Sequence, residues 1–111
     1  MPTIFEPKDL PITEKHGVSV ATLANQTMLG TDALQVERIT LSAGAESSTY
    51  KAVAFERFVY VVRGKGQAYI NEQIFPLKTE SVLWLEKGDT FYLEASSDEF
   101  EVLLCQAPMS G

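Results

Sequence analysis

The fold of this chain is decided by residues 55–66, which have the sequence FERFVYVVRGKG. Aromatic and β-branched residues dominate positions 55–63, and glycines follow at Gly64 and Gly66. Such a run, bounded by turn residues, predicts a β-strand that ends at Gly64. Similar short runs, separated by Gly, Asn, Asp or Ser, predict further strands at 18–23, 34–41, 67–70, 73–77, 81–85, 90–93 and 100–105. This even spacing predicts an all-β, antiparallel sandwich or barrel.

Length and composition indicate one domain with a real core. The chain has 111 residues, of which 45% are hydrophobic, so it needs neither a disulfide nor a metal to fold. Three of the five prolines fall in the first fifteen residues, and proline is confined to the edges of sheets. We therefore expect an extended N-terminal arm over residues 1–17, a β-barrel over 18–107 and a short tail at 108–111.

The charge pattern limits the classes of partner that the protein can bind. The net charge is −6, and the nine Lys and Arg residues are scattered, which argues against binding to nucleic acid or to anionic membranes. The apolar runs are too short to span a bilayer, and the N-terminus lacks the pattern of a signal peptide. A single cysteine, Cys105, fits a reducing compartment. We expect a cytoplasmic protein.

Residues 34–106 resemble a small single-domain cupin, the RmlC-like jelly roll. The first cupin motif begins at Gly44 and ends at Gly64, and residues 56–64 match the strand and turn of that motif. Residues 81–91 fit the frame of the second motif, with Gly88 at its second glycine. The resemblance implies a double-stranded β-helix that is often dimeric, so we expect a homodimer.

The residues that bind metal in cupins do not carry over to this chain. The resemblance places Tyr50 and Ala52 at the two histidines of the first motif, Arg57 at its glutamate and Phe91 at the histidine of the second motif. A divalent metal needs about three His, carboxylate or Cys ligands. We therefore predict no metal site and no other cofactor.

The inward-facing residue at the start of the strongest strand depends on the loop before it. If the loop after Ala52 is one residue shorter, Glu56 instead of Arg57 points inward, because side chains alternate with period two. We favour Arg57, since Val59 and Val61 then follow it on the same face. Phe58 and Tyr60 would face the other sheet surface or a dimer partner.

Four residues are candidates for the lining of the barrel. Arg57 offers a planar fork for a carboxylate or phosphate. Tyr50 offers a hydroxyl, and Trp84 and Phe91 offer stacking surfaces. Small barrels are also often filled by their own side chains, so the same residues could simply pack the interior.

Three functions fit this pattern. The first is metal-free binding of a small anionic or aromatic molecule in the barrel. The second is a metal-independent isomerase, epimerase or cyclase, with Tyr50 and either Glu56 or Glu86 as acid and base. The third is a structural dimerisation module whose pocket has closed. No catalytic residue is assigned, and His16, the single histidine, lies in a polar turn typical of exposed residues.

Overall fold

The chain folds as an all-β protein, as predicted. The computed structural model describes residues 10–24, 35–51, 55–86, 88–96 and 98–108. Its nine strands are β1 (Ile12–Lys15), β2 (Val18–Ala24), β3 (Gln35–Leu41), β4 (Phe55–Arg63), β5 (Lys65–Ile70), β6 (Gln73–Lys78), β7 (Val82–Leu85), β8 (Phe91–Ala95) and β9 (Phe100–Pro108). Within these described segments no helix is long and apolar enough to cross a membrane.

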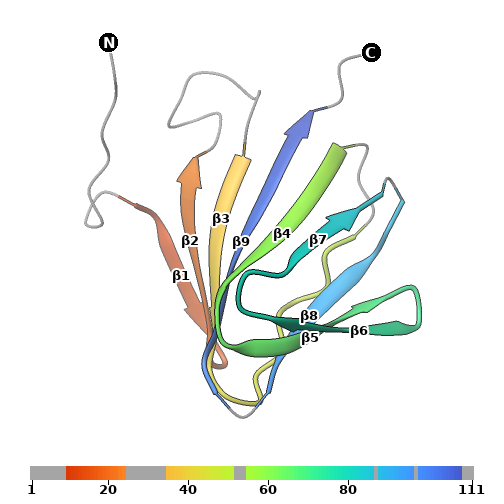
Figure 1. Ribbon diagram of the computed structural model, residues 1–111. Coiled ribbons are helices and arrows are strands. Elements are labelled where there is room, and N and C mark those ends of the chain that lie inside the picture. The colour runs from red at the N-terminus through yellow and green to blue at the C-terminus, as the bar shows by residue number, and fades with distance from the viewer. Residues whose placement is uncertain (1–9, 25–34, 52–54, 87, 97, 109–111) are drawn as a thin grey trace.

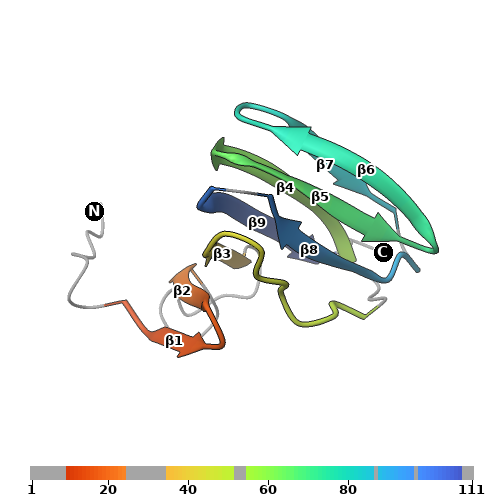
Figure 2. The same cartoon turned by 90° about the horizontal axis from the view of Figure 1, so that it is seen from below.

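The strands form two antiparallel sheets that face each other. The larger sheet has the order β1-β2-β3-β9-β4-β7, and the smaller has the order β6-β5-β8. The strands of the larger sheet fan out side by side in Figure 1, with the smaller sheet crossing in front of one end. Seen from below, the smaller sheet covers β4, β7 and β9, whereas the β1–β2 hairpin extends beyond its β8 edge (Figure 2).

The core lies between the two sheets and follows from period-two alternation along each strand. Val59 and Val61 on β4 are fully buried, as are Leu93 on β8 and Val102 on β9. Arg57, two residues before Val59, is 2% exposed, while its neighbour Glu56 is exposed. The alternative left open by the sequence is therefore settled in favour of an inward Arg57.

Two tight hairpins use left-handed residues. His16 and Gly17 join β1 to β2 with φ of 51° and 80°, and Asn71 and Glu72 join β5 to β6 with φ of 48° and 71°. Positive φ at both central residues is the conformation that matches the twist of a two-residue hairpin.

The predicted N-terminal arm is in part a strand of the barrel. Ile12 to Lys15 form β1, which pairs antiparallel with β2, so the sheet begins before the expected boundary at residue 17. Residues 1–9 and 109–111 lie outside the described residues, and Pro108 is the last residue of β9. The sequence did not indicate β1 because its side chains are all exposed and carry no apolar alternation.

Candidate functional site

Arg57 closes one end of the barrel by joining two loops. Its Nη1 donates to the carbonyl oxygen of Lys51 at 3.2 Å, and its Nη2 donates to the carbonyl oxygen of Asp89 at 2.7 Å. The third nitrogen, Nε, is buried and has no hydrogen-bond partner among the described residues. Burial lowers the pKa of Arg57, and the nearby Asp89 charge opposes that shift. Both Nη atoms already donate to backbone carbonyl oxygens, so the guanidinium can offer a ligand its positive charge but not a free bidentate pair of donors.

Tyr50 and Phe91 lie beside this arginine. Their rings stack with centroids 5.0 Å apart, and Cζ of Arg57 lies 5.2 Å from the centroid of the Phe91 ring. The backbones of Tyr50 and Phe91 exchange two hydrogen bonds, of 2.7 and 3.0 Å. Phe91 is 1% exposed, while Tyr50 is only partly buried. The tyrosine therefore forms the accessible side of the stack.

Strand register adds polar side chains that the sequence reasoning missed. Gln106 on β9 lies between Gln35 on β3 and Arg57 on β4, and Gln106 Nε2 donates to Gln35 Oε1 at 2.6 Å. Glu37 occupies the next inward position of β3, two residues before the buried Ile39. We call the set of Gln35, Glu37, Tyr50, Arg57, Phe91 and Gln106 the barrel mouth.

The barrel mouth contains perturbed titratable groups. Burial raises the pKa of the Glu37 carboxyl. Burial and the nearby Glu37 charge together raise the pKa of Tyr50 to about 12. Both shifts favour the neutral form of the group, and burial is the largest cause of each. Groups with shifted pKa values gather at functional sites, although buried structural groups show such shifts too.

Trp84 does not line the barrel, contrary to the prediction. Its side chain is 59% exposed, and it stacks on Phe58 at a centroid distance of 6.0 Å. Phe58 and Trp84 are opposite each other on β4 and β7, on the outer face of the larger sheet. The inward positions of β7 belong to Leu83 and Leu85, because side chains alternate along the strand.

The acid and base suggested for a metal-independent enzyme do not meet. Glu56 and Glu86 are both exposed, whereas the carboxylate whose charge acts on Tyr50 is that of Glu37. A tyrosine with a pKa of about 12 is also poorly matched to proton transfer near neutral pH. The acid–base pair named from the sequence is therefore not assembled in the structure.

The positions that correspond to cupin metal ligands do not fit a divalent cation. Tyr50, Arg57 and Phe91 converge, but a guanidinium repels a cation and a phenyl ring cannot ligate one. Ala52 lies outside the described residues. Among the residues that are described, no group of three or more His, Cys, Asp or Glu side chains could hold a metal ion. We derive no metal chemistry for the barrel mouth.

Comparison with known families decides the classification. The sequence profile described as the AraC-like ligand binding domain matches residues 33–105. This range includes five of the six residues of the barrel mouth and ends just before the sixth, Gln106. The chain belongs to the AraC-like ligand-binding domain family. No curated protein matches the sequence closely enough to count as a relative.

Solved structures share the fold of this AraC-like domain. A protein described as a predicted oxalate decarboxylase from Thermotoga maritima is 16% identical, with a TM-score of 0.82 over 96% of this chain and 100% of its own. An RmlC-like cupin from Shewanella frigidimarina is 14% identical, with a TM-score of 0.76 over 98% and 93%. The Streptomyces nucleoside dehydratase Pac13 is 19% identical, with a TM-score of 0.78 over 100% and 86%. These likenesses confirm the predicted cupin fold and, at such low identity, establish the fold alone.

We expect the Glu37→Gln substitution to stabilise the protein at about pH 7. A carboxyl whose pKa is raised by folding contributes stability below its ordinary value of 4.5 and loses that contribution as the pH rises through the raised value. Glutamine removes the charge, so the variant should unfold at a higher urea concentration than wild type near neutral pH. The gain should vanish at about pH 4, where Glu37 is largely protonated. An equal gain at both pH values would contradict the argument.

Proposed function

We propose that the barrel mouth binds a small organic molecule, anionic or aromatic, without a metal ion. The observation that carries this proposal is a row of inward polar side chains across three strands, in which Gln106 bonds to Gln35 and lies opposite the buried Arg57. This row stands beside the stacked rings of Phe91, which Arg57 contacts, and Tyr50, on which the Glu37 charge acts. An apolar pocket with a few polar groups is the usual form of a small-molecule site. The family, whose description names ligand binding, supports a small-molecule role.

The charges of the barrel mouth favour an anionic partner. Arg57 supplies a positive charge, and the raised pKa of Glu37 reduces the negative charge that an anion would meet. The Tyr50 ring is the partly accessible member of its stack and offers a surface for an aromatic group. Hydroxy acids, sugar acids and aromatic carboxylates combine these features, and they form the panel for a first test.

We expect at least one compound of that panel to raise the thermal unfolding midpoint, and Gln106→Leu to weaken its binding by about 5- to 30-fold. The substitution removes one or two hydrogen bonds, each of about 1 kcal/mol, from the centre of the row that joins Gln35 to Arg57. Isothermal titration calorimetry on wild type and variant measures the loss directly.

The matched control is Gln73→Leu, which makes the same change at an exposed position of β6. It should leave the affinity unchanged. A panel in which every hydroxy acid, sugar acid and aromatic carboxylate leaves the unfolding midpoint unmoved would count against the proposed function. So would a compound that binds Gln106→Leu as tightly as wild type.

We also propose that the protein is a homodimer that uses the outer face of β4 and β7. Val82 and Trp84 are 62% and 59% exposed, and Phe58 and Tyr60 stand beside them on β4. Contiguous exposed apolar side chains of this kind mark interaction surfaces. The scattered basic residues support a role without nucleic acid, and the free Cys105 supports a reducing, cytoplasmic location.

Trp84→Lys should convert the dimer into a monomer, because it places a charge in the middle of the apolar face. Light scattering coupled to size exclusion should change from about twice the chain mass of 12.3 kDa to that mass. Phe75→Lys, at a 38% exposed phenylalanine of the other sheet, should leave the dimer intact. A wild-type protein that is already monomeric would rule out the dimer.

A further inference from the structure

A hollow lies away from the barrel mouth, where the β1–β2 hairpin extends beyond the smaller sheet. It has a volume of about 390 Å³ and runs between the hairpin and residues 46–48. Figure 2 shows the hairpin standing clear of β8 on this side. We call it the hairpin groove, and it is lined by none of the residues of the barrel mouth.

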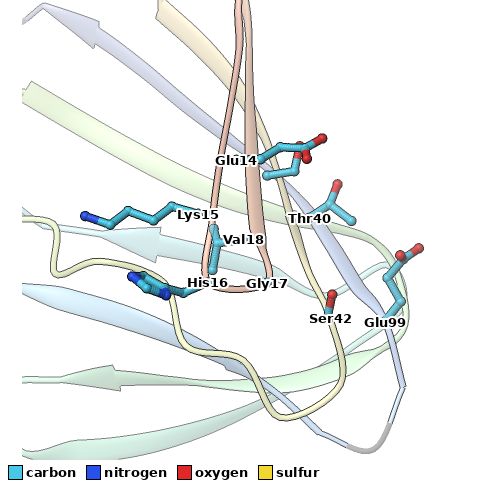
Figure 3. A pocket seen from close by; sticks show the side chains of 9 residues that line it. Glu14, Lys15, His16, Gly17, Val18, Thr40, Ser42 and Glu99 are labelled. Atoms are coloured by element: carbon cyan, nitrogen blue, oxygen red, sulfur yellow. The ribbon is translucent and has the colours of Figure 1, made fainter.

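The hairpin presents two different faces. Lys15 pairs with Val18, and Thr13 pairs with Val20, so these four side chains share the face that lines the groove. Figure 3 shows Lys15 and the neighbouring His16 pointing away from Glu14, Thr40, Ser42 and Glu99, which gather on the opposite side. Lys15 and His16 are thus separated from the Glu14 carboxylate of the hairpin.

The floor of the groove is apolar and firmly supported. Val18 and Val20 are partly buried and pack against the hydrophobic core of the barrel. At the hairpin tip, the chain places its single histidine, His16, in the left-handed conformation that Asn or Gly more commonly adopts. The groove therefore offers an apolar surface that ends at two basic side chains, in a protein whose net charge is −6.

The far wall is a segment that backbone hydrogen bonds hold against β8. Ala45 and Ser47 hydrogen bond to β8, through Ala95 N to Ala45 O at 2.9 Å and Ser47 N to Leu93 O at 2.8 Å. The Glu46 carboxylate also lines the groove, so an amine is the competing ligand that the test must include.

We propose that the hairpin groove binds a small carboxylate with an apolar body, such as a short-chain or medium-chain acid. The apolar body would lie on Val18 and Val20, and the carboxylate would meet Lys15 and His16 at the hairpin tip. The Lys15 ammonium beside the apolar floor selects this class, because an alcohol of equal length gains only the apolar contact and an amine meets that ammonium as a like charge. The proposal does not depend on what the barrel mouth binds.

The test is a titration of the full chain with hexanoate, hexanol and hexylamine, followed by NMR. Since the chain has one histidine, its imidazole signals report on His16 without ambiguity. Hexanoate should move these signals and the amide signals of Glu46 and Ser48, saturating at a concentration on the order of 1 mM to 10 mM. Hexanol and hexylamine at equal concentration should move them far less.

Variants locate the interaction. Lys15→Met should weaken hexanoate binding by about fivefold or more, whereas Lys78→Met, at an exposed position of β6, should leave it unchanged. Gln106→Leu should also leave it unchanged, which separates this site from the barrel mouth. The proposal is overturned if hexanol or hexylamine binds as well as hexanoate, if Lys15→Met has no effect, or if the shifted signals belong to Tyr50 and Phe91 instead.

Discussion

Gly64→Ala is expected to lower the free energy of unfolding by about 3–5 kcal/mol. Gly64 has φ of 89° at the bend where β4 of the larger sheet leads into β5 of the smaller sheet. A Cβ atom at this position would collide with the backbone carbonyl oxygen of Glu99 and crowd the Cα of Phe100. Since both groups are backbone, the clash cannot be relieved by rotating a side chain.

The matched control for Gly64→Ala is Gly88→Ala. Gly88 has a nearly identical φ of 87°, but none of the residues that the structure describes lies within 4 Å of the Cβ that alanine would add. Gly88→Ala should lower the free energy of unfolding by only about 1–2 kcal/mol, which is the strain of the left-handed backbone. Gly64→Asn adds a second check, because asparagine tolerates positive φ and yet carries the same Cβ. Urea unfolding in which Gly64→Asn and Gly88→Ala match would show that strain, and not the collision, sets the cost.

Phe91→Ala should lower the free energy of unfolding by about 3–5 kcal/mol, because it opens a cavity under the barrel mouth. The side chain is 1% exposed, stacks on Tyr50 and lies under the Arg57 guanidinium. Removing the ring should also let water reach Tyr50, so its pKa should fall from about 12 toward the ordinary value of 10.0. Absorbance of tyrosinate against pH measures that second effect.

The sign of the pH dependence follows from the same shift. A tyrosine whose pKa is raised by folding contributes stability below its unfolded value of 10.0, and this contribution is lost as the pH rises through about 12. Phe91→Ala should flatten this alkaline loss. Phe75→Ala makes the same substitution at a half-exposed position of β6, and it should cost less than about 1 kcal/mol and leave the alkaline limb unchanged. If Phe91→Ala left the loss of stability at alkaline pH unchanged, Phe91 would not be the cause of the raised pKa of Tyr50.

The inward orientation of Arg57 could be predicted because it is a local property. Val59 and Val61 follow at two-residue intervals, and one strand is enough to read that alternation. Trp84 could not be placed in this way. Residues 82–85 are apolar at every position, so both faces of β7 look equally suited to the core. Only pairing with β4, which sets Trp84 opposite the outward Phe58, assigns the tryptophan to the outer face.

The partners of Arg57 at the barrel mouth depend on contacts between distant segments. Gln35 and Gln106 are 71 positions apart, and no local pattern links them. Both lie near the ends of their strands, where the sequence alone does not show that a polar side chain points inward. A signal was available in β3, whose inward positions change along the strand from the polar Gln35 and Glu37 to the apolar Ile39 and Leu41. That pattern could have indicated a polar opening at one end of the barrel.

By itself, the sequence determined strands β2 to β9, the cupin-type barrel and the residues at the positions that correspond to cupin metal ligands. These features are encoded locally, in period-two alternation, turn residues and short motifs. The tertiary structure decided which polar groups meet at the barrel mouth, which face Trp84 occupies and that β1 extends the sheet to form the hairpin groove. The physical reason is strand register: a shift of one residue between distant strands exchanges the inner and outer faces, and long-range pairing sets that register.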